Sequence, residues 1–388
     1  MGCKRKGLRV LGLVLGILLL LLVVVAGSVI ISQWPRPAEP GEKPVYGLVW
    51  YGRNNVSQPV KSGQNNPYYD PAKPTIIFVH GWLPDQAGSP PTFHYVVENE
   101  AGNTLLDANL ADAWIDAGWN AGFFYWTSFA DEDVVTAAEN KIWTADSLVG
   151  MRWRSADGEY HVDGAPDVSA SVLFYEAYKS ALADYEGDTI RLAGHSLGNQ
   201  MAVALTLQIL EGIEQGEIGE NLRPQRLALL DPYWSLEEKE FLDGKNAGAV
   251  VREAVTEQII PAGILVEWYR SSLLTQGEPV SDANEGLRPL TAYTRLAPNF
   301  CPVTDQVCRH DAAWQWYFLS YAAPPPAECV RSGPDAPCEA TGDAAASASA
   351  PDERIAEMMS LPQQWRQVHG RLTPQADDDW FERLEIGD

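Results

Sequence analysis

The chain has 388 residues, of which 46% are hydrophobic and 10% aromatic, so it is long enough to bury one large core or two ordinary ones. This composition excludes an intrinsically disordered protein. The formal net charge of −24 repels nucleic acid and anionic lipid surfaces, so we expect no nucleic-acid partner and a neutral or cationic substrate.

The N-terminal residues predict a membrane anchor. Residues 1–9 carry four basic side chains and no acid, and residues 10–31 form an uncharged apolar run. A helix of that length crosses a hydrocarbon core of about 30 Å. We expect a basic cytoplasmic segment at 1–9, a transmembrane signal-anchor at 10–31 and an extracytoplasmic (periplasmic or extracellular) remainder. A cleaved signal peptide is the alternative. Residues 32–44 predict a proline-rich tether.

Strand-like and helix-like runs alternate beyond the tether. This alternation predicts an α/β fold with a mostly parallel central sheet and helices on both faces, in one catalytic domain at 45–322. The expected strands lie at 46–52, 75–82, 121–126, 189–194, 225–231 and 263–272, and the expected helices at 110–118, 168–185, 198–213 and 248–260.

Two segments depart from this alternation. Residues 131–164 predict an insertion that contains a hairpin with Asp157 and Gly158 at its turn, and it is either a cap over a site or a surface excursion. We expect a C-terminal extension at 323–388 with a disulfide loop, a flexible linker at 339–353 and a solvated acidic tail at 375–388.

Four cysteines follow the apolar run in two close pairs. We expect disulfides Cys301–Cys308 and Cys329–Cys338, in agreement with an oxidising compartment. Four free thiols are the alternative, although no Cys-x-x-Cys or histidine-rich spacing indicates a metal site.

The stretch "LAGHSLGNQMA" places Ser196 between a strand-like and a helix-like run. Gly194 and Gly198 allow a sharp turn and close packing of the helix on the sheet. Ser196 is then exposed at the tip of the turn, with the positive end of the helix behind it. We predict that Ser196 is a nucleophile, and helix capping is the alternative.

A nucleophilic serine needs a base and an acid to orient that base. Of the histidines after Ser196, we expect His310 to be the base, since it lies beside an expected disulfide and before a helix, whereas His369 lies in a charged surface segment. Two acids compete for the third position. Asp231 ends a clean apolar strand, and Asp282 lies in a polar stretch after a later strand; we expect Asp231.

The motifs "FVHGW", "GHSLG", "LALLDP" and "VCRHDAAWQWY" together resemble the α/β-hydrolase superfamily, most closely its pancreatic-lipase-like branch of lipases and esterases. The resemblance covers about residues 75–321. It implies an α/β-hydrolase fold, an acid in the Leu-Asp-Pro sequence at Asp231, and a base at His310 ahead of an aromatic-rich helix.

An oxyanion hole completes such a site. We expect one N–H donor from Leu197 and another from Gly81 or Trp82. The predicted function is a serine hydrolase that cleaves a small-molecule or lipid carboxylic ester through an acyl-enzyme, without a metal or organic cofactor. A peptidase or amidase with the same triad, or a non-catalytic anchored binding protein, are the alternatives. The sequence leaves the oligomeric state open.

Overall fold

The computed structural model describes residues 36–386 apart from 39–41, 99–101 and 334. The expected cytoplasmic segment, membrane anchor and first part of the tether lie outside these residues. Within the described ranges, no helix has both the length and the apolarity needed to cross a membrane.

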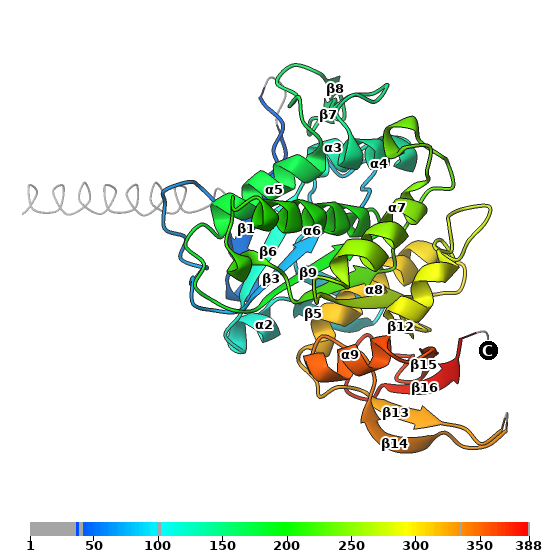
Figure 1. Cartoon of the computed structure of the whole chain (residues 1–388). Coiled ribbons are helices and arrows are strands. Elements are labelled where there is room, and N and C mark those ends of the chain that lie inside the picture. Colours follow the sequence, from blue (N-terminus) through cyan, green and yellow to red (C-terminus); the bar gives the residue numbers. More distant parts are fainter. Residues whose placement is uncertain (1–35, 39–41, 99–101, 334, 387–388) are drawn as a thin grey trace, which may run out of the picture.

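A twelve-stranded sheet forms the centre of the described chain, with helices packed on it (Figure 1). One end of the sheet consists of β14 (Glu339–Ala344), β13 (Ala327–Val330) and β16 (Trp380–Glu385). The full order is β14-β13-β16-β15-β12-β11-β10-β9-β3-β6-β1-β2. Seven neighbouring strands run parallel: β6 (Asn120–Tyr125), β3 (Thr75–Val79), β9 (Ile190–His195), β10 (Arg226–Leu230), β11 (Leu265–Arg270), β12 (Ala292–Arg295) and β15 (Gln363–His369). Strands β1 (Gly47–Tyr51) and β2 (Ser57–Pro59) complete one edge in antiparallel pairing.

Helices cover both faces of this sheet. Ile77 and Val79 of β3 face a core shared with α4 (Val135–Trp143), α5 (Ala170–Ala181), α6 (Gly198–Glu214) and α7 (Ala247–Ala254). Ile76 and Phe78 face a second core shared with α2 (Asp112–Asp116), α8 (Gln306–Ser320) and α9 (Asp352–Met359). Burial on both faces explains why the central strands β3 and β10 consist almost entirely of apolar residues. The mostly parallel α/β architecture is confirmed, and it fits the α/β-hydrolase fold.

Shorter elements connect these layers. A separate hairpin pairs β4 with β5, α3 precedes the insertion, and a π-helical turn continues α7. Their bounds are β4 (His94–Glu98), β5 (Thr104–Asn109), α3 (Thr127–Ala130) and Val255–Ile259 for the π-helical turn, with 3-10 turns at Arg53–Asn55, Glu220–Leu222, Glu240–Leu242 and Glu285–Leu290.

The insertion at 131–164 contains the expected hairpin, since β7 (Trp153–Arg154) pairs antiparallel with β8 (Tyr160–His161) and Gly158 has a φ of +84° at the turn. The fully buried carboxylate of Glu132 forms ion pairs with Lys141 and Arg152 beneath it. These ion pairs join residues of the insertion to one another, so they stabilise the insertion itself.

The expected linker at 339–353 is wrong. Residues Glu339–Ala344 form β14, which pairs antiparallel with β13 (Ala327–Val330). The small residues that follow are buried, and their carbonyl groups accept hydrogen bonds from two sheet arginines: Arg191 donates to Ala348 at 2.7 Å and Arg226 donates to Ser347 at 3.0 Å. The small side chains of these residues allow the segment to pack tightly on the sheet.

The expected solvated tail is also wrong. Residues Trp380–Glu385 form β16, which lies between β15 and β13 in the sheet. Phe381 has no exposed surface and packs edge-on against Trp316 of α8, with ring centroids 5.7 Å apart. Burial of the Phe381 ring stabilises the packing of β16 in the sheet, although acidic residues precede this strand.

Both expected disulfides are confirmed, Cys301–Cys308 ahead of and within α8 and Cys329–Cys338 between β13 and the start of β14. The first closes a seven-residue separation immediately before His310, and the second closes a nine-residue separation in the C-terminal extension.

Candidate active site

Ser196 lies at the tip of the turn between β9 and α6, with a φ of +56°. A side chain on Gly194 would collide with the carbonyl group of Gly198, and a side chain on Gly198 would collide with the carbonyl group of Val79. The two glycines therefore allow the helix to begin directly against the sheet. A strained non-glycine residue at such a turn is typical of a functional position.

Asp231 follows the neighbouring strand β10, where Leu230 pairs with His195 of β9. Its carboxylate is fully buried. It accepts hydrogen bonds from the backbone N–H of Ser271 at 2.9 Å, from the hydroxyl of Thr275 at 2.8 Å and from the hydroxyl of Ser272. Residues 196 and 231 thus leave adjacent parallel strands at the same sheet edge, where the sites of open α/β sheets are built.

His310 lies in the first turns of α8. Asp305 caps this helix by accepting a 2.9 Å hydrogen bond from the N–H of Cys308. The Nδ1 atom of His310 lies 2.6 Å from Oδ2 of Asp231. The structure therefore brings together His310 and Asp231, which are 79 residues apart in the chain.

Each partner changes the pKa of the other. Burial raises the pKa of Asp231, but the hydrogen bond and charge of His310, together with the Ser272 and Ser271 donors, outweigh burial and lower it to about 2. Burial lowers the pKa of His310, but the hydrogen bond and charge of Asp231 outweigh it and raise the pKa. An ionised carboxylate therefore holds the imidazole with its Nδ1 as the donor.

The competing residues lie elsewhere. Asp282 accepts from the side chain of Asn246 at 3.3 Å and from the N–H of Asn284 at 2.8 Å, in the loop beside α7. His369 is exposed at the end of β15, near Trp380. Of the two acids and two histidines weighed from the sequence, Asp231 and His310 are the pair in contact.

His310 lies beside the residue that precedes Ser196 in the turn. The ring of His195, the residue before Ser196, lies 4.4 Å from the ring of His310 between centroids. Within the described part of the chain, the hydroxyl of Ser196 forms no hydrogen bond with the imidazole of His310. Catalytic hydrogen bonds are often long before substrate binds and shorten in the Michaelis complex.

Three contacts at this site were missed from the sequence. The hydroxyls of Ser272 and Thr275 hold Asp231, and their position directly after β11 was the available signal. The Nε2 atom of His195 lies 3.1 Å from the carbonyl oxygen of His310 and donates to it. Burial lowers the pKa of His195, so its ring is neutral and holds the backbone of His310 by this hydrogen bond.

The expected oxyanion residues pack directly against the Ser196 turn. A Cβ atom on Gly81 would lie 2.5 Å from Cβ of Ser196 and 2.9 Å from the nitrogen of Leu197. Among the residues described, the backbone N–H groups of Trp82 and Leu197 have no acceptor. Both are therefore free to bind a developing negative charge.

His80 orients this loop. Its Nδ1 donates to the carbonyl oxygen of Gly81 at 2.9 Å, while its Nε2 accepts from the N–H of Trp126 at 3.3 Å. Burial lowers the pKa of His80 to about 4, which keeps the ring neutral. Because C=O and N–H point in opposite directions in a trans peptide, the bond to Gly81 fixes the direction of the Trp82 N–H.

The insertion also contacts this loop. The indole nitrogen of Trp82 donates to the carbonyl oxygen of Glu132 at 2.6 Å, and that of Trp143 donates to Gln200 of α6 at 2.7 Å.

Across the residues that the structure describes, no group of three or more His, Cys, Asp or Glu side chains is arranged to hold a metal ion. The site consists of a serine turn, an imidazole–carboxylate pair and two available N–H groups.

No protein-family model matches the chain, and no curated protein matches it. Solved structures give distant similarities. A poly(3-hydroxybutyrate) depolymerase from Bordetella parapertussis matches with 15% identity and a TM-score of 0.29, over 56% of this chain and 61% of that one. A lipase/esterase from Lactobacillus plantarum matches with 12% identity and a TM-score of 0.30, over 71% of this chain and 96% of that one. This chain therefore spans less than two thirds of the depolymerase, and function is inferred from the site itself.

Proposed function

We propose that this protein is a serine hydrolase of the pancreatic-lipase-like branch, which cleaves carboxylic esters through an acyl-enzyme. The observation that carries the proposal is the 2.6 Å contact between His310 and the buried Asp231, at the sheet edge where Ser196 occupies a strained turn. Structural histidines seldom need a buried, ionised carboxylate held by three further donors, whereas a general base does.

In the proposed mechanism, Oγ of Ser196 attacks the acyl carbon and its proton passes to Nε2 of His310. Asp231 stabilises the imidazolium that forms. The N–H groups of Leu197 and Trp82 bind the oxyanion, and each such donor contributes about 3 kcal/mol of transition-state stabilisation. The alkoxide leaves with the proton from His310. Water then attacks the acyl-enzyme, with His310 as the base, and releases the acid and free Ser196.

The substrate and location belong to the same proposal. A small-molecule or lipid ester is the substrate class that this machinery serves without a cofactor. An anchor at 10–31 would hold the catalytic domain on the extracytoplasmic side of a membrane. The two disulfides support an oxidising compartment of that kind.

A fluorophosphonate probe tests the nucleophile. We expect one label per chain at Ser196, and none in Ser196→Ala. Ser171→Ala is a matched control, because Ser171 is a buried serine in α5 with ordinary side-chain partners. Labelling that persists in Ser196→Ala would identify another nucleophile.

A panel of p-nitrophenyl esters of increasing chain length, with matched anilides, tests the reaction. We expect hydrolysis of the esters. Hydrolysis of the anilides alone would assign the site to an amidase or peptidase, and an unlabelled, inactive wild-type chain would assign it to a binding protein.

A further inference from the structure

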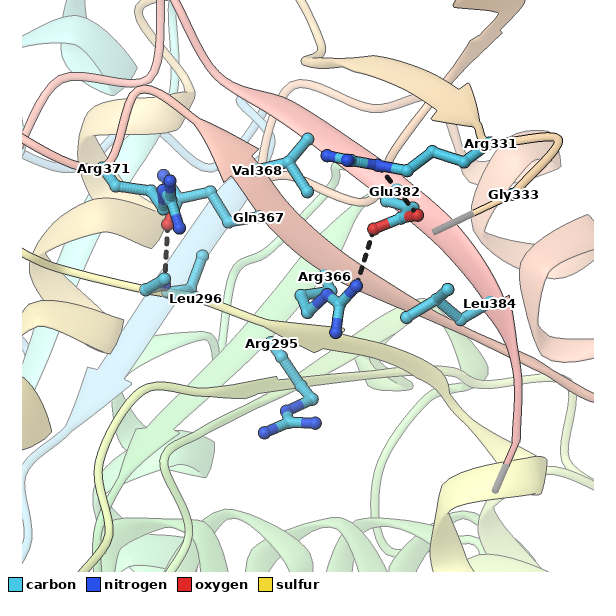
Figure 2. A pocket seen from close by; sticks show the side chains of 11 residues that line it. Arg295, Leu296, Arg331, Gly333, Arg366, Gln367, Val368, Arg371, Glu382 and Leu384 are labelled. Carbon is cyan, nitrogen blue, oxygen red and sulfur yellow. Dashed lines mark hydrogen bonds and ion pairs between the residues drawn. The ribbon is translucent and has the colours of Figure 1, made fainter. Parts of the chain in front are cut away.

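A cavity away from the candidate active site lies on the C-terminal part of the sheet. It measures about 730 Å³, and its walls come from β12, β15, β16 and the segment after β13 (Figure 2). Four arginines line it, Arg295, Arg331, Arg366 and Arg371, against a single acid, Glu382. The pocket therefore has a surplus of three positive charges in a chain whose net charge is −24.

Strand register places these charges on one face of the sheet. Arg295 of β12 pairs with Arg366 of β15, and Arg366 pairs with Glu382 of β16. Paired residues on neighbouring strands project from the same face. Two arginines are thus direct cross-strand neighbours, an arrangement that costs stability unless a negative charge lies nearby.

Glu382 supplies only part of that negative charge. One of its oxygens lies 3.2 Å from Nε of Arg331 and the other lies 2.7 Å from Nη2 of Arg366, as Figure 2 shows. Both carboxylate oxygens are therefore occupied. Among the residues that the structure describes, Arg295 and Arg371 form no ion pair, so their guanidinium groups are available to a ligand.

The opposite face of the same strands is different. There Glu328 is fully buried and pairs with Arg354 of α9 and with Arg383 of β16. A second acid, Glu357, also pairs with Arg354, so two arginines meet two glutamates. The charges are balanced where α9 covers the sheet and unbalanced where the cavity opens.

The positive lining continues toward the candidate active site. A neighbouring cavity of about 220 Å³ shares Arg295, Leu296 and Ala297 with the arginine pocket and adds Arg270 and Arg309, with no acid in its lining. Its wall includes Ser272, whose hydroxyl holds Asp231. The basic surface thus runs from the pocket to the loop behind the triad acid.

We propose that the arginine pocket binds an anion that carries two or more phosphate groups. Guanidinium groups donate paired hydrogen bonds in the planar geometry that phosphate oxygens accept. A surplus of three charges matches a di- or triphosphate group better than a single carboxylate. The volume exceeds what one inorganic ion fills and lies in the range of small-molecule sites. The acidic remainder of the surface repels such anions, so the pocket is a local reversal of sign.

The ligand's phosphates belong either to a soluble molecule or to a lipid headgroup. Calorimetric titration of the full chain with sodium tripolyphosphate, in about 0.15 M salt, measures the shared chemistry. We expect saturable binding that weakens at least about tenfold in Arg295→Gln/Arg371→Gln, since each lost charge-assisted hydrogen bond is costly. The matched control is Arg53→Gln/Lys61→Gln, which removes the same charge at exposed positions outside the pocket.

Flotation with cardiolipin vesicles separates the two sources. Vesicle binding that falls in the pocket variant, and that tripolyphosphate displaces, assigns the site to a lipid headgroup. Equal vesicle binding by the wild type and the pocket variant, with tripolyphosphate binding still lost in the variant, assigns it to a soluble ligand. The proposal is overturned if tripolyphosphate does not saturate the wild type below about 1 mM. It is also overturned if the pocket variant and the control variant, both with unchanged melting temperatures, bind tripolyphosphate equally well.

Discussion

His310 and Asp231 meet through a 2.6 Å contact between Nδ1 and Oδ2, although one residue lies in α8 and the other ends β10. The contact depends on two independent supports. Donors after β11 hold the carboxylate, and a capped, disulfide-linked helix N-terminus holds the imidazole. We therefore expect that changes to the Asp231 carboxylate and changes to the start of α8 can be tested separately.

Asp231→Asn tests the carboxylate. The amide favours the wrong imidazole tautomer, so we expect kcat for ester hydrolysis to fall about ten-thousandfold while the melting temperature changes little. Asp282→Asn is the matched control, because Asp282 binds Asn246 and Asn284 and is expected to leave kcat unchanged. The opposite ranking of the two variants would place the acid after the later strand.

The pH dependence of kcat/KM tests the base. His310 acts as a base only when neutral, and Asp231 raises its pKa above the ordinary value of 6.5. Activity should therefore fall as the pH falls through that raised pKa. In Asp231→Asn the inflection should move to lower pH, since the stabilising charge is gone. Ester hydrolysis between about pH 5 and pH 9 measures both curves. An unmoved inflection would mean that another group titrates.

The Cys301–Cys308 disulfide should affect rate more than the other disulfide does. It ends two residues before His310, and Arg309 donates to the carbonyl oxygens of Pro302 and Cys301 at 3.2 Å each. A displacement of about 1 Å in a catalytic group costs about a hundredfold in rate. We expect that loss of kcat/KM in Cys301→Ser/Cys308→Ser.

Cys329→Ser/Cys338→Ser is the control for that experiment, because its disulfide joins β13 to the segment before β14. Its kcat/KM should stay close to that of the wild type. Equal losses in the two disulfide variants would indicate a general effect on folding rather than a local effect on His310.

Phe381→Ala tests the structural role of the C-terminal strand. Loss of a fully buried phenylalanine leaves a cavity beside Trp316, and we expect it to lower the free energy of unfolding by about 3 to 5 kcal/mol. Leu372→Ala, at a side chain that is 72% exposed, should change it by less than about 0.5 kcal/mol. Chemical denaturation compares the two, and a stable Phe381→Ala would mean that β16 contributes little.

Local patterns explain what could be predicted from the sequence. Burial on both faces leaves nearly continuous apolar runs in β3 and β10, and the turn around Ser196 depends on glycines within two residues of it. The disulfides join cysteines that are close in the chain. In each case the structure depends on residues that are close in the chain, or on the burial that every central strand of such a sheet shares.

The misjudged segments depend on distant partners. The segment after β14 is held on the sheet because Arg191 and Arg226 donate to the carbonyl groups of Ala348 and Ala350 from strands more than 100 residues earlier. Likewise, His195 supports His310 across 115 residues, through a backbone oxygen that no side-chain pattern reveals. Small and polar composition alone does not distinguish such packing from a flexible linker.

The parallel pairing of β15 with β12 has a consequence for solubility. A chain cut after α8 would leave β12 with a row of backbone N–H and C=O groups open to other chains, which is a template for aggregation. In the intact sheet the outermost strands are protected. Strand β14 carries exposed Glu339 and Asp343, and β2 at the other end contains Pro59, which has no N–H to offer. The C-terminal extension thus also keeps the sheet from growing by addition of a neighbouring molecule.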